Sequence, residues 1–187
     1  MNLKEKINAI YALQSDELDL LLNTAERFTF PKNHLLITTE RVEKYIYFIE
    51  KGIARAYCNT EKQQLTFWFG LAGDIVFSFN SYINEKPGYE NIDLLEDSIL
   101  WRFPHQTLQE LFTKHVGLAN WGRKLAELEL VKTEERFINQ QFKTATERYQ
   151  DLLKNSPSLL QNVQLTYIAS YLGVTPVTLS RIRAEIK

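Results

Sequence analysis

Hydrophobic residues change their spacing twice along this chain, and each change marks an expected structural boundary. Residues 2–27 carry apolar side chains three or four positions apart, which predicts helix, with Ser15 as an N-cap within this range. Between Phe28 and Phe103, short runs of aromatic and β-branched residues alternate with glycine-containing turns at roughly ten-residue intervals. This pattern predicts a small barrel or sandwich of short strands.

Residues 78–91, SFNSYINEKPGYEN, interrupt the strand region with a short helix or an ordered loop, and a ligand of the barrel is expected there. From Pro104 to about Asn155 a long helical region follows, almost without breaks. Its apolar residues form one seam: Leu118, Trp121, Leu125, Leu128, Val131, Ile138 and Phe142. Packing on its own domain can account for the first half of such a seam. The remaining length predicts a homodimer through residues 117–142.

The last thirty residues or so indicate a helix-turn-helix. A break at residues 155–158 separates them from the long helix, and the boundary of the final domain is expected between residues 145 and 156. Gly173 stands where a left-handed residue ends a helix, Thr175 is the expected cap of the next helix, and Pro176 is its first residue. In this motif the second helix enters the major groove of DNA.

The second helix, residues 175–186, has an inner face of Leu179, Ile182 and Ile186, and Arg181 lies opposite that face. Arg181 is suited to a bidentate contact with guanine, Val177 to a thymine methyl group, Ser180 weakly to either role, and Thr178 to phosphate. The candidate DNA-binding residues are Thr175, Val177, Thr178, Ser180, Arg181 and Arg183. Any capped amphipathic helix pair, however, presents a polar outer face that can include an arginine.

Charge and cysteine content narrow the function classes. The net charge is −1, but residues 141–187 hold six Lys/Arg against three acids, or +3, which leaves 16 − 20 = −4 for residues 1–140. We therefore expect the C-terminal part to make any contact with an anionic polymer. Cys58 is the single cysteine, so no internal disulfide can form. Neither a secretory leader nor a membrane span is recognisable, and a cytoplasmic location is expected.

Several motifs resemble the Crp/Fnr family of bacterial transcription regulators, in particular its short members from Bacteroidetes-like bacteria. ERYQDLL (147–153) and IASYLGVTPVTLSRIR (168–183) are similar to the C-terminal domain of that family. KGIARAY (51–57), FGLAGDIV (69–76) and LLEDSILWRF (94–103) resemble strands of its cyclic-nucleotide-binding-like jelly roll.

The resemblance implies an α+β fold with a jelly-roll β-barrel and flanking helices over residues 1–116. A long dimerisation helix over 117–145 and a helix-turn-helix domain over 146–187 follow. It also implies a homodimer on an inverted-repeat operator of double-stranded DNA, with RNA polymerase as a candidate partner. The family reads bases at positions that correspond here to Pro176, Val177 and Arg181, of which only Arg181 has an obvious base-reading side chain. Because the sequence ends at Lys187, the family's β-hairpin wing is expected to be incomplete or absent.

The effector of the barrel is not identified by the sequence. Members that bind cyclic AMP use a Gly-Glu pair and an arginine about ten residues later. Gly73-Asp74 fits the first role approximately, although a plain turn is the favoured reading. Residues 87–90, Pro-Gly-Tyr-Glu, leave the arginine role vacant, so cyclic AMP is not expected to bind. The candidate effector-pocket residues are Gly73, Asp74 and Tyr89.

The sequence lacks the groups of residues that several other functions require. No cysteine cluster suits an iron–sulfur sensor, and His34, His105 and His115 are isolated, so neither a cofactor nor a metal is expected. No catalytic constellation stands in a recognisable context, which argues against an enzyme. The alternative that stays open is a ligand-sensing or protein-interaction module of the same fold that has lost DNA binding.

Overall fold

The computed structural model describes residues 2–61 and 63–186, and these fall into two compact units. Unit 1 comprises Met1–Ala56 and Phe69–Glu129, and unit 2 comprises Tyr57–Trp68 and Leu130–Lys187. Unit 2 thus joins a central segment of the sequence to the C-terminal third. The division into residues 1–116, 117–145 and 146–187 stays a prediction.

Two helices, not one helical stretch to residue 27, open the chain. They are α1 (Leu3–Ile10) and α2 (Ser15–Asn23), and strand β1 already begins at Glu26. The backbone is extended at Tyr11 and Gln14, which breaks the apolar period between the helices. Ser15 is the first helical residue and not the cap, because the cap position belongs to Gln14.

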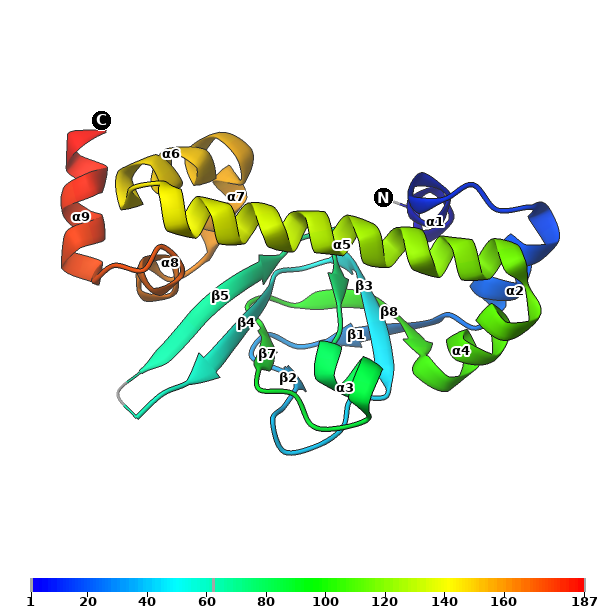
Figure 1. The fold of residues 1–187 in the computed structure, drawn as a ribbon. Helices are drawn as coiled ribbons and strands as arrows, with labels where there is room; N and C mark the ends of the chain where they lie inside the picture. The colour runs from blue at the N-terminus through cyan, green and yellow to red at the C-terminus, as the bar shows by residue number, and fades with distance from the viewer. Residues whose placement is uncertain (1, 62, 187) are drawn as a thin grey trace. The chain divides into compact units, whose positions relative to one another are not determined.

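Within the described residues, eight strands form two four-stranded sheets, and the predicted α+β jelly-roll class is confirmed. Figure 1 shows these strands beside the helices. One sheet has the order β1-β8-β3-β6 and the other the order β2-β7-β4-β5. The strands are β1 (Glu26–Phe30), β2 (Leu35–Ile37), β3 (Tyr45–Lys51), β4 (Ala54–Asn59), β5 (Gln64–Gly70), β6 (Ile75–Val76), β7 (Asn91–Leu94) and β8 (Ser98–Pro104). Helix α3 (Phe79–Asn84) lies between β6 and β7, so the short helix predicted in residues 78–91 is confirmed.

The expected long helical region is divided into three helices. They are α4 (His105–Lys114), α5 (Val116–Phe142) and α6 (Ala145–Asn155). The backbone is extended at His115 and at Thr144, and Thr144 begins α6 with a capping box to Glu147. The uninterrupted reading from 104 to 155 was therefore wrong at these two positions, whereas α5 closely matches the helix expected over 117–142.

The start of α5 belongs to the core of unit 1. Leu118, Trp121 and Leu125 are buried in one cluster with residues of α1, α2, β3 and β8. The Trp121 indole N–H donates to the carbonyl of Ile7 at 2.9 Å, so the large aromatic side chain is also satisfied as a donor. The ring of Trp121 lies 6.2 Å from that of Phe48. The first half of the predicted seam therefore packs on its own domain.

Gly52, between β3 and β4, has no room for a side chain. Its φ is +124°, and an added Cβ would lie 2.1 Å from Oγ of Ser98, a fully buried residue. We expect Gly52→Ala to reduce the free energy of unfolding by about 2–4 kcal/mol, through backbone strain and overpacking. Urea titration would measure the change, and adding Ser98→Gly should recover only the part due to crowding. An unchanged midpoint for Gly52→Ala would contradict this account.

Candidate functional site

The predicted helix-turn-helix corresponds to α8 (Leu165–Tyr171) and α9 (Pro176–Glu185), which follow α7 (Pro157–Asn162) in unit 2 (Figure 1). Gly173 adopts φ +68°, the left-handed conformation expected of a residue that ends a helix. Oγ1 of Thr175 accepts the N–H of Thr178 at 3.1 Å, and Pro176 occupies the first turn of α9. These local predictions are confirmed.

Helix α9 has the two faces that its sequence predicts. Leu179 and Ile182 are buried, with exposed fractions of 0% and 6%. Val177 has an exposed fraction of 62%, and Arg181 on the same outer face is exposed. The outer surface therefore offers a long cation beside a small apolar side chain. The other candidate DNA-binding residues are also exposed: Thr175, Thr178, Ser180 and Arg183.

Two hydroxyl groups of α9 already have partners within the helix. Oγ of Ser180 donates to the carbonyl of Pro176 at 3.0 Å, so it must leave this bond before it can donate to a base. The Thr178 and Thr175 hydroxyl oxygens lie 3.0 Å apart and share a hydrogen bond. Compared with these hydroxyl groups, an exposed guanidinium such as that of Arg181 is the stronger directional donor.

Arg148 on α6 connects the end of α5 with the end of α8, a role that the sequence did not indicate. Its guanidinium donates to the carbonyl of Lys143 at 2.5 Å, of Gln140 at 3.3 Å and of Leu172 at 2.7 Å. These carbonyls belong to the last turn of α5, the residue after it, and the end of α8, where helical carbonyls lack partners within the helix. One cation thus links α5, α6 and the turn before α9.

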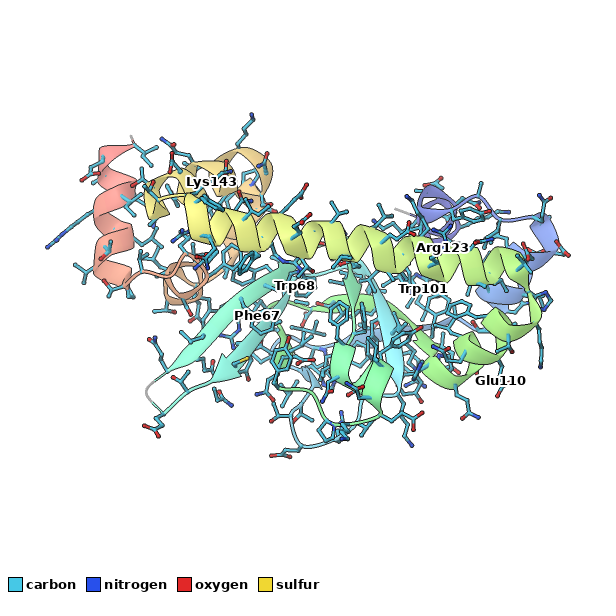
Figure 2. All side chains as sticks on the ribbon, in the orientation of Figure 1. Phe67, Trp68, Trp101, Glu110, Arg123 and Lys143 are labelled. Atoms are coloured by element: carbon cyan, nitrogen blue, oxygen red, sulfur yellow. The ribbon has the colours of Figure 1, made fainter. Side chains whose placement is uncertain are left out.

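An ion pair supports the same junction. Lys143 lies just after α5 (Figure 2). Its Nζ is 2.6 Å from Oδ2 of Asp151 on α6. Both side chains are partly exposed, so we assign the pair a small contribution to stability. The Thr144 backbone N–H and hydroxyl donate to the Glu147 carboxylate, and these bonds lower the pKa of that carboxyl. The spacing of this capping box was a local sequence signal for the start of α6.

The second half of the α5 seam is exposed in this single chain. Val131 is 51%, Ile138 45% and Phe142 82% exposed, and Leu128 is 37% exposed. Glu135 lies among them in sequence and is also exposed. An apolar helical stripe with this exposure is typical of a surface that a partner covers.

Gly73 and Asp74 form a tight turn. Asp74 N–H donates to the carbonyl of Leu71 at 2.9 Å, and the Asp74 carboxylate accepts the N–H of Leu71 at 3.0 Å. Gly73 has φ +95°, and its N–H donates to the carbonyl of Ile49 at 2.7 Å. This arrangement agrees with the favoured interpretation of the pair as a turn, because the Asp74 carboxylate already accepts a backbone N–H.

The loop after α3 contains a buried carboxylate where a cyclic phosphate would need an arginine. Glu90 is 5% exposed, and its Oε2 accepts the N–H of Tyr89 at 3.0 Å. A Cβ added at Gly88 would lie 2.7 Å from Oε1 of Glu90 and 2.5 Å from Oγ of Ser78, so the loop is closely packed. Tyr89 itself is 66% exposed. The loop therefore holds a buried carboxylate at position 90 and an exposed tyrosine at position 89.

Glu43 is a second buried acid, and its backbone contacts α3. The Glu43 carboxylate accepts the N–H groups of Lys44 and Tyr45 at 2.9 and 3.0 Å, and the Glu43 N–H donates to Oγ of Ser81 at 3.1 Å. Burial raises the pKa of Glu43 and also that of Tyr47, whose hydroxyl donates to this carboxylate at 3.2 Å. Helix α3 is thus connected to this loop through the backbone N–H of Glu43 and the side chain of Ser81.

Two other kinds of site are absent from the described part of the chain. No group of three or more His, Cys, Asp or Glu residues is arranged to hold a metal ion there. Of the helices described, none has both the length and the apolar character needed to cross a membrane.

Residues 27–115 match the family model of the cyclic nucleotide-binding domain. Among solved structures, FixK2 from Bradyrhizobium japonicum is 20% identical, with a TM-score of 0.74 over 87% of this chain and 84% of that one. A putative Crp/Fnr-family transcriptional regulator from Eubacterium rectale is 14% identical, with a TM-score of 0.71 over 92% and 83%.

The CLP protein of Xanthomonas campestris, described as a c-di-GMP responsive global regulator, is 14% identical, with a TM-score of 0.67 over 92% and 91% of the two chains. A search of curated protein sequences finds no match. At these identities the structures show a common fold. They confirm the resemblance to Crp/Fnr regulators and the α+β jelly-roll class, with regulatory proteins among the neighbours.

Proposed function

We propose that this chain is a DNA-binding transcription regulator that recognises an inverted repeat through α9. The observation that carries the proposal is the exposed Arg181 on the outer face of a correctly capped second helix, opposite the buried Leu179 and Ile182. In such a motif the second helix lies in the major groove and an outward arginine can bind guanine O6 and N7. Val177 is suited to a thymine methyl group, and the exposed Thr175, Thr178, Ser180 and Arg183 to flanking contacts.

The proposed active form is a homodimer through α5. The exposed stripe of Leu128, Val131, Ile138 and Phe142 has the spacing of a two-stranded coiled coil. A two-fold axis would place two copies of α9 on successive half-sites of DNA, about 34 Å apart. Recruitment or exclusion of RNA polymerase is the expected consequence of binding beside a promoter, and a cytoplasmic location agrees with both partners.

Selection of bound duplexes from a random DNA pool tests the proposal directly. The full chain is expected to enrich an inverted repeat with a guanine in each half-site, and its affinity should fall steeply with salt. Parallel selections with cell metabolites would identify a small-molecule effector if one is required. Failure to retain any duplex at low salt, with and without metabolites, would favour the alternative of a sensing or protein-interaction module without DNA binding.

Cyclic AMP is expected not to bind this chain with useful affinity. The buried Glu90 carboxylate would repel a cyclic phosphate, and residues 85–91 contain no arginine to neutralise it. Titration calorimetry should show no heat of binding at micromolar concentrations, for Glu90→Gln as well as for the wild type, since an arginine is missing from both. Low-micromolar affinity of the wild type would overturn this reading of the loop.

A further inference from the structure

The hairpin of β4 and β5 is attached to the helix-turn-helix through the hydroxyl of Ser170 on α8. Oγ of Ser170 accepts the N–H of Thr66 at 2.9 Å and donates to the carbonyl of Gln64 at 3.1 Å. Strand β5 is the last strand of its sheet, so these two backbone groups lie on an edge without a neighbouring strand. The serine hydroxyl satisfies them and connects the edge to α8 within unit 2.

Thr60 and Gln63, which flank the turn of the hairpin, are joined by hydrogen bonds. The Thr60 N–H donates to the carbonyl of Gln63 at 2.9 Å, and the Thr60 hydroxyl donates to the same carbonyl at 2.8 Å. The Gln63 N–H donates in turn to Oγ1 of Thr60 at 3.1 Å. Gln63 is exposed, and its backbone is held on both sides of the turn. Together with the Ser170 contact, these bonds hold Gln63 beside the DNA-binding motif.

A groove of about 790 Å³ lies between the hairpin tip and the start of α9. Gln63 lines it on the hairpin side, Thr166 and Tyr167 on α8, and Thr175 and Thr178 at the start of α9. Its described lining combines amide and hydroxyl groups with apolar residues, among them Leu65, Val174 and Pro176, and includes no carboxylate. A volume in the range of ordinary ligand sites admits a group of nucleotide size, and amide and hydroxyl groups without a carboxylate suit an anionic occupant.

We propose that the sugar-phosphate backbone of one DNA strand lies in this groove, with the Gln63 amide donating to a phosphate. Thr178 both lines the groove and lies on α9. A DNA duplex that contacts Arg181 would therefore place one of its sugar-phosphate strands next to the β4–β5 hairpin. The β4–β5 hairpin is then a second DNA-contacting element beside α9. This inference rests on the proposed function, since it names a further part of the same DNA interface.

A charge series at position 63 tests the contact. Gln63→Lys should tighten binding to the selected duplex by roughly threefold to tenfold, and the salt dependence of the dimer should steepen by about 1.8, or about 0.9 per added phosphate contact. Gln63→Glu should weaken binding by roughly tenfold or more, because a carboxylate then faces a phosphate. Gln106, an exposed residue of α4 in unit 1, is the control position. Gln106→Lys and Gln106→Glu make the same net charge changes and should have much smaller effects on DNA binding.

A substitution that removes the Ser170 contact provides a second test. Ser170→Ala should speed hydrogen exchange at the Thr66 amide and should reduce the gain from Gln63→Lys, which makes the two substitutions non-additive. The proposal is wrong if the wild type binds the selected duplex while the series at 63 matches the series at 106. It is equally wrong if removing the Ser170 contact strengthens binding, because the hairpin would then cover the DNA-binding face. A wild type that binds no duplex rejects the proposed function together with this inference.

Discussion

Binding to an inverted-repeat duplex should weaken by about 2–6 kcal/mol when Arg181 is replaced by alanine. Each of the two half-sites would lose one bidentate contact to guanine, at about 1–3 kcal/mol each. The preference for that base pair should relax at the same time, since only a base contact carries sequence information. Fluorescence anisotropy on selected and scrambled duplexes, at several salt concentrations, measures both effects.

Two control variants separate base reading from general attraction. Thr178→Ala should weaken binding to all sequences alike if Thr178 contacts phosphate. Lys154 is an exposed residue of α6. Lys154→Ala removes the same charge as Arg181→Ala and should leave the base preference intact. Urea titrations must first show that each variant folds normally, as the exposed side chains lead us to expect. If Arg181→Ala binds the selected duplex as tightly as the wild type, the groove assignment of α9 is wrong.

A carboxylate introduced into the exposed stripe of α5 should convert the dimer to a monomer. Val131→Glu or Ile138→Glu would place an unpaired charge in the dimer interface, and both copies would carry it. The cost is about 3 kcal/mol or more, which raises the dimer dissociation constant more than about 100-fold. Light scattering should give a mass near the single-chain 21.9 kDa for these variants at micromolar concentrations and about twice that for the wild type.

Gln141→Glu is the matched control for this experiment. It adds the same charge to an exposed position of α5, roughly 100° around the helix from Phe142, and should leave the dimer intact. The monomeric variants should also lose most of their affinity for a full inverted repeat, because they can hold only one half-site. A wild type with the mass of one chain would refute the proposed assembly. Val131→Glu with the mass of a dimer would move the interface elsewhere.

The strongest sequence predictions concern interactions between near neighbours in the chain. The positive φ of Gly173, the cap at Thr175 and the buried face of Leu179 and Ile182 all follow from local rules, and the structure confirms them. The helix start predicted at Ser15 is one residue off, because Gln14 occupies the cap position, and the extended backbone at Tyr11 ends the preceding helix.

The sequence by itself determined the order of the parts: short strands, a long helix with one apolar stripe, and a capped helix pair with Arg181 outward. These properties depend on side-chain period and end caps, which act over a few residues. Only the tertiary structure decided which half of the stripe is buried, that Glu90 is enclosed in its loop, and that Ser170 joins α8 to β5. The Ser170 contact spans 104 residues. Such contacts are set by how the elements pack, and no local pattern in the sequence encodes them.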